Sequence, residues 1–141
     1  MPRSNSDLEH GGTGGGWLPG AALRGIVAGL RGAGHEVAAC GLLLASGRPL
    51  PALEKVLASH ALIHTAEGEL FREALRAASR ECGLPLAAVR ERDLFARGAA
   101  DLGIPETLAE MGRALGPPWR QDEKFAAIAA WLALKAAENT A

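Results

Sequence analysis

The segment SHALIHTAEGELFREAL, residues 59–75, gathers side chains suited to acid–base or metal chemistry. It contains His60, His64, Glu67 and Glu69. Histidine can move a proton near neutral pH, and glutamate oxygens bind hard cations such as Mg²⁺ and Mn²⁺. His60 and His64 are four residues apart, so they would share a face in a strand or a helix and could ligate one metal ion. The alternative is a histidine bonded to backbone and a glutamate favoured by the dipole of a helix start.

A second acidic group occurs in GPPWRQDEK, residues 116–124, where the last expected helix opens. Capping of that helix would by itself explain Asp122 and Glu123. A functional role requires one of them to approach Glu67. Paired carboxylates could then hold Mg²⁺ or Mn²⁺, which would polarise a phosphodiester and generate hydroxide.

Arginines could grip the phosphates of such a substrate, or could simply be solvated or salt-bridged. The candidates are Arg48, Arg90, Arg92 and Arg120.

Hydropathy patterning predicts the elements that would position these residues. Three apolar runs are expected as strands: HEVAACGLLLAS, ALIHT and LPLAAV. Helical spacing of apolar residues predicts helices at 19–32, 51–59, 69–82, 92–103, 105–116 and 122–137. The last of these is apolar almost all round and is expected to lie against the sheet.

Strands that alternate with helices indicate a parallel sheet with right-handed crossovers. The expected fold is therefore α/β, a small and mostly parallel three-stranded sheet with about six helices in two or three layers. Residues 1–16, which end in GGTGGG, are expected to be a flexible glycine-rich tail, and residues 17–141 a single α/β domain. A short strand near Trp17 or a partner chain could complete so small a sheet.

Ligands of open parallel sheets bind beyond the carboxyl ends of the strands. This rule makes His64 and Glu67 the candidate catalytic residues, and Glu67, Asp122 and Glu123 the candidate metal ligands. The candidate substrate-binding residues are Arg48, Thr65, Glu69, Arg90, Arg92 and Arg120.

Composition limits the partners and the compartment. The chain has 141 residues and a net charge of −1, so no global field draws it to nucleic acid or anionic membranes, although a local basic patch could. Cys40 and Cys82 lie in apolar patterns and are expected as reduced, buried thiols of a cytoplasmic protein; a disulfide is the alternative. The start, MPRSNSDLEHGG, does not look like a secretory signal, and the apolar run FAAIAAWLAL is too short to span a bilayer. No membrane partner is expected.

From HEVAACGLLL onward the chain resembles the later half of the RNase H-like superfamily, the RuvC-type resolvases in particular. In this resemblance HALIHTAEG matches the strand that ends at a metal-binding glutamate, LPLAAVRER the next strand, and QDEKFAAIAAWLAL the last, acidic helix. It implies that Glu67, with Asp122 or Glu123, ligates metal. The family opens with a strand that carries a catalytic aspartate, whereas here the only early aspartate is Asp7, in the tail.

Two functions follow. One is a divergent RNase H-like domain that acts on or binds nucleic acid, with Mg²⁺- or Mn²⁺-dependent phosphodiester hydrolysis. The other is a non-catalytic α/β module that binds a nucleotide or a protein partner, with a homodimer through an exposed sheet edge as one expected form. The clustered His64, Glu67 and Glu69 favour the first, and the missing aspartate favours the second.

Overall fold

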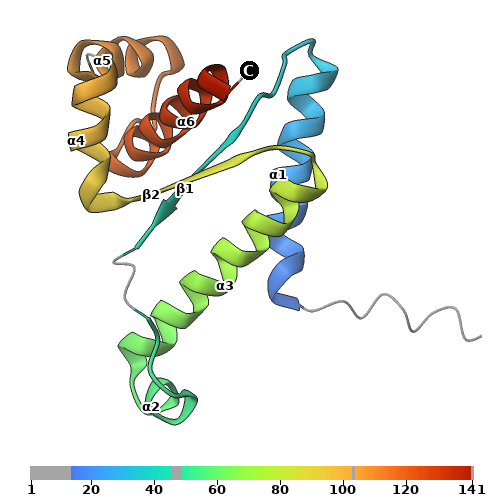
Figure 1. Ribbon diagram of the computed structural model, residues 1–141, viewed down its shortest axis with the longest axis vertical. Coiled ribbons are helices and arrows are strands. Elements are labelled where there is room, and N and C mark those ends of the chain that lie inside the picture. The colour runs from blue at the N-terminus through green and yellow to red at the C-terminus, as the bar shows by residue number, and fades with distance from the viewer. Residues whose placement is uncertain (1–13, 46–48, 103, 141) are drawn as a thin grey trace, which may run out of the picture. The chain divides into compact units, whose positions relative to one another are not determined.

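A computed structural model describes residues 14–45, 49–102 and 104–140. Within these ranges the chain forms six helices and two strands (Figure 1). In order they are α1 (Gly14–Gly32), β1 (Cys40–Leu44), α2 (Leu53–Leu57), α3 (His60–Glu81), β2 (Leu86–Arg90), α4 (Glu91–Leu102), α5 (Ile104–Leu115) and α6 (Gln121–Thr140). The elements group into two compact units. A helical unit contains α1, α2 and α3, and a sheet unit contains β1, β2, α4, α5 and α6.

The prediction of a three-stranded sheet is wrong. The sheet in the described part of the chain has two parallel strands, paired from Cys40 with Leu86 to Leu44 with Arg90. The segment ALIHT, expected as the middle strand, forms the first turns of α3. Ser59 begins this helix, because its Oγ accepts a hydrogen bond from the backbone N–H of Leu62 at 3.3 Å and so satisfies a donor that the first turn leaves free.

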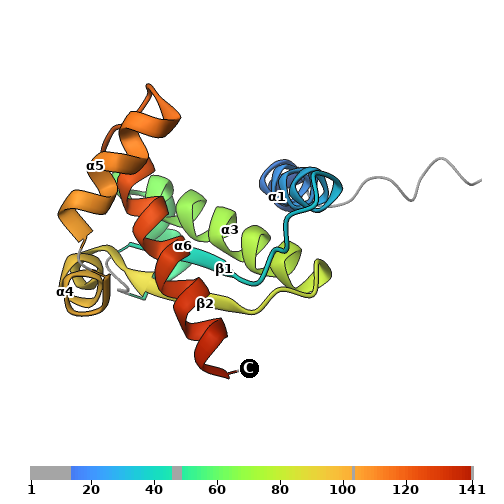
Figure 2. The same ribbon diagram turned by 90° about the horizontal axis from the view of Figure 1, so that it is seen from above.

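Small residues bring α1 onto the carboxyl-terminal half of α3. A Cβ placed on Gly20 of α1 would lie 3.7 Å from the Cβ of Ala78, which is 1% exposed. An ion pair between Arg24 and Glu81, at 2.8 Å, flanks this contact. Figures 1 and 2 both show α1 beside the carboxyl-terminal part of α3. The amino-terminal part of α3 extends beyond α1, and the short α2, whose Val56 is buried, packs on α3.

The exit from α1 is a Schellman turn. Gly34 has a φ of 88°, the left-handed conformation that glycine adopts without steric cost. The N–H of His35 bonds to the carbonyl of Leu30, and the N–H of Gly34 to the carbonyl of Arg31, both at 3.0 Å. These bonds satisfy carbonyls that the end of the helix leaves free.

In the sheet unit, α6 packs on β1 and β2, as its nearly continuous apolar sequence predicts. The approach is closest at Gly41, where a Cβ would lie 2.7 Å from the backbone nitrogen of Ala130 and closer still to the carbonyl of Ala129. Glycine is required here because no side chain fits between strand and helix. The buried cluster of this unit contains Val89, Leu94, Leu108, Ile128, Ala129 and Leu132.

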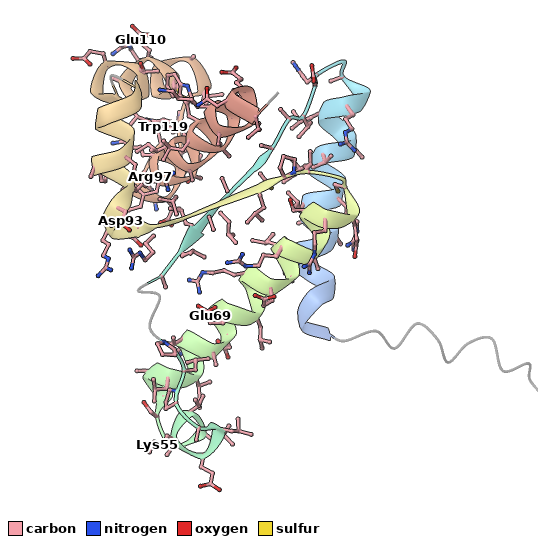
Figure 3. All side chains as sticks on the ribbon, in the orientation of Figure 1. Lys55, Glu69, Asp93, Arg97, Glu110 and Trp119 are labelled. Atoms are coloured by element: carbon pink, nitrogen blue, oxygen red, sulfur yellow. The ribbon has the colours of Figure 1, made fainter. Side chains whose placement is uncertain are left out.

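The turn between α5 and α6 places Trp119 against this cluster. The indole lies on Gly112 of α5, where any Cβ would collide with it, and Figure 3 shows it beside α5 and α6. Its Nε1 is buried and has no hydrogen-bond partner among the described residues.

The two cysteines are free thiols, as predicted, but they are half-buried rather than buried. No helix in the described ranges is both long enough and apolar enough to cross a bilayer.

Candidate functional site

Four residues form one line along α3 from its first residue to just past its middle. They are His60, His64, Glu67 and Phe71, and they follow one another at intervals of four, three and four residues. These intervals keep side chains on a single face of a helix. We call these four residues the α3 ladder.

The ladder continues the face of α3 that α1 covers. Ala74 and Ala78 are the next residues on that face, and they are 8% and 1% exposed beneath α1. In contrast Phe71 is 55% exposed, and the side chains of His64 and Glu67 are 62% and 61% exposed. One helix face is therefore packed in its second half and open in its first half.

Hydrogen bonds link three members of the ladder. The Nε2 atoms of His60 and His64 are 3.0 Å apart, with the rings edge to face, and Nδ1 of His64 lies 3.2 Å from Oε2 of Glu67. A carboxylate can only accept, so Nδ1–H of His64 donates to Glu67. A neutral His64 then has an unprotonated Nε2, which accepts a hydrogen bond from Nε2–H of His60.

The other predicted residues of this segment bond within their own helix. Thr65 Oγ1 donates to the carbonyl of Ala61 at 3.0 Å, and Glu69 pairs with Arg72 at 2.8 Å. Neither they nor His64 and Glu67 lie beyond the end of a strand, because the strand expected before them is part of α3. The site prediction assumed that these residues lie beyond the carboxyl end of a strand of the sheet, and this assumption is incorrect here.

The arginines near β2 also have local partners. Arg90, the last residue of β2, donates from Nε to Asp93 at 2.9 Å, and Arg92 lies 3.9 Å from the same carboxylate. Asp93 was not among the predicted residues, although its spacing of three residues from Arg90 at a helix start was the available signal. Arg48 lies outside the described residues.

The acidic start of α6 is a helix cap. Oε2 of Glu123 accepts a hydrogen bond from the backbone N–H of Arg120 at 2.8 Å, the geometry in which an acidic side chain in the first turn reaches back to the residue before the helix. Hydrogen bonds from the backbone N–H groups of Glu123 itself and of Arg120 lower the pKa of the Glu123 carboxyl. Asp122 beside it is exposed.

The carboxylates predicted to share a metal ion belong to different units. Glu67 is in the helical unit, while Asp122 and Glu123 are in the sheet unit. Across the described part of the chain, no three or more His, Cys, Asp or Glu side chains form a group able to hold a metal ion. The Mg²⁺ or Mn²⁺ site remains a prediction.

The relationship to the RNase H-like superfamily also remains a prediction. The strand that it requires at HALIHTAEG is a helix. Comparison of the chain with protein-family models, with curated proteins and with solved structures gave no match.

Proposed function

We propose that this chain is a non-catalytic interaction module, that the α3 ladder is its docking surface, and that its partner is a second copy of the chain. The observation that carries the proposal is the continuity of one face of α3, which α1 covers at Ala74 and Ala78 and leaves open at the ladder. The same face thus already packs against a helix along half of its length.

Exposed apolar side chains favour burial of the open half of this face. Phe71 and its neighbour Leu70 are 55% and 62% exposed. The α2 helix, which packs on α3, also exposes two leucines, Leu53 and Leu57, at 69% and 64%. Covering the exposed half of one phenylalanine contributes about 1 kcal/mol, and a symmetric pair gains this twice.

The spacing of the ladder supports a second copy as the partner. Intervals of four, three and four residues read the same in both directions along the helix. A two-fold axis between residues 65 and 66 therefore places His60 opposite the partner's Phe71, and His64 opposite the partner's Glu67, in antiparallel helices. An aromatic ring can pack on an imidazole, and a carboxylate can accept a hydrogen bond from one, so each contact is complementary once His64 donates its Nδ1–H to the partner's Glu67 in place of its own. Two-fold pairing is also the commonest symmetry of homo-oligomers.

Sedimentation equilibrium of the untagged full chain tests the surface. We expect a reversible dimer whose dissociation constant rises at least tenfold in Phe71→Ser. The matched control is Leu115→Ser, which removes an apolar side chain of α5 that is 69% exposed, and we expect it to leave the dimer unchanged. A monomer at every concentration, or a dimer indifferent to Phe71→Ser, would refute the proposal.

A charge exchange tests the register. Glu67→Lys places a cation opposite the partner's His64 and is expected to weaken the dimer. Adding His64→Glu restores an opposite charge across the two-fold axis and is expected to recover most of the association. Recovery in this double variant but not in Glu67→Lys with His35→Glu would support the antiparallel register; equal recovery in both would exclude it.

The enzymatic alternative needs its own assay. The chain is incubated with single- and double-stranded nucleic acid in the presence of Mn²⁺. Cleavage that Glu67→Gln abolishes would replace the proposed function with the phosphodiesterase.

A further inference from the structure

We infer that His60 and His64 form a two-imidazole site for a late first-row divalent metal ion, of which Ni²⁺ and Cu²⁺ fit best. The inference goes beyond the proposed pairing and does not depend on it, because both ligands belong to one chain and one helix. Neighbouring turns of α3 bring the two rings together, with centroids 4.5 Å apart.

The separation of the two nitrogens suits a single metal ion. At metal–nitrogen bonds of about 2.0–2.1 Å, two nitrogens that are 3.0 Å apart subtend an angle of about 91–97° at the metal. This angle corresponds to adjacent positions of a square-planar or octahedral ion, the geometries that Cu²⁺ and Ni²⁺ adopt with nitrogen ligands. Imidazole is also a preferred ligand of these ions.

Glu67 fixes the tautomer of one of the two ligands, His64. Its carboxylate lies 3.2 Å from Nδ1 of His64 and so keeps the proton on that nitrogen, which leaves the lone pair of Nε2 available. Metal-binding histidines commonly donate their second ring N–H to such a carboxylate. Glu67 is thus a positioning residue.

His60 must change tautomer before it binds metal. Its proton leaves Nε2 and a proton from water adds to Nδ1, so that neutral His60 gains a free Nε2 with no net loss of a proton. The bond between the two Nε2 atoms is then replaced by two bonds to the metal ion.

In the unpaired chain the site is open to solvent and to exchange. His64 is 62% exposed, and the described residues offer no third His, Cys, Asp or Glu that completes the set. Water would fill the remaining coordination positions, so the bound ion is exchangeable.

Titration of Ni²⁺ alone into the untagged full chain tests the inference. The titration is run on the wild type and on Phe71→Ser, so that metal binding can be interpreted whether or not the chain dimerises. Calorimetry should give one ion per chain in both backgrounds. The paramagnetic broadening of histidine ring signals should centre on His60 and His64.

Variants identify the ligands. We expect His60→Ala and His64→Ala each to weaken binding at least tenfold and Glu67→Gln to weaken it less. The control His35→Ala, at an exposed histidine of the same unit, should leave it unchanged. Unaltered affinity in either ladder variant, half an ion per chain, or broadening centred on His10, Cys40 or Cys82 would overturn the inference.

Discussion

Replacing Gly41 with alanine tests how closely α6 packs on β1. The added Cβ would lie 2.7 Å from the nitrogen of Ala130, whereas ordinary contacts begin at 3.4 Å. The obstructing atoms are backbone, so no side-chain rotation relieves the collision, and α6 must move away by about 0.7 Å or more. Overpacking of this kind costs about 1–3 kcal/mol. Alanine recovers about 0.4–1 kcal/mol through the unfolded chain, so we expect a net loss of about 1–2 kcal/mol.

Urea denaturation, followed by circular dichroism and tryptophan fluorescence, measures this loss. The matched control is Gly29→Ala in α1, because a Cβ there meets nothing within 4 Å. This control should stabilise the protein by about 0.5–1 kcal/mol, because alanine is the better helix former. If Gly41→Ala were as stabilising as Gly29→Ala, the packing of α6 on β1 described above would be wrong.

Three further substitutions have expected outcomes. Ser59→Ala removes the cap of α3 and should lower the free energy of unfolding by about 0.5–2 kcal/mol in urea denaturation. A change near zero would show that the cap does not stabilise the protein. Gly112→Ala forces the indole of Trp119 from its place and should cost about 1–3 kcal/mol with altered tryptophan fluorescence; an unchanged spectrum would contradict the contact. Glu123→Gln should destabilise the protein above the ordinary carboxyl pKa of 4.5, because a pKa lowered by folding contributes stability there. That difference should vanish as the pH falls through the lowered pKa, and a pH-independent difference would exclude the linkage.

Local sequence patterns predicted the elements whose ends are set by neighbouring residues. The run around GLLL, bounded by turn residues, corresponds to β1, and LPLAAV to β2. The error at ALIHT arose because a short apolar run fits a buried strand and a helix start equally well. Ser59 and the helical spacing of Leu62, Ile63 and Ala66 were the signals that favour the helix.

The candidate site depended on a contact between distant segments, which local sequence patterns do not predict. His60, His64 and Glu67 share a face because all three are in α3, and that neighbourhood follows from their spacing. An approach of Glu67 to Asp122 required the fold of the whole chain. The capping role of Glu123, weighed as the simpler explanation, needs only a contact three residues away. The close approach at Gly41 depends on α6, which lies far along the chain, so no sequence pattern near Gly41 predicts it.

The order of the elements along the chain has a consequence for biosynthesis. The helical unit is complete once Cys82 has emerged, whereas β1 emerges earlier and belongs to the unit that closes last. Gly41 can meet Ala129 only once Ala129 has been made, about 4–18 s after Gly41 at about 5–20 residues per second. During that interval the CGLLL strand lacks the helix that will cover it, and unpaired apolar strands associate readily with other chains. The nascent protein is therefore most vulnerable to aggregation, and most in need of a chaperone, between the emergence of β1 and the emergence of α6.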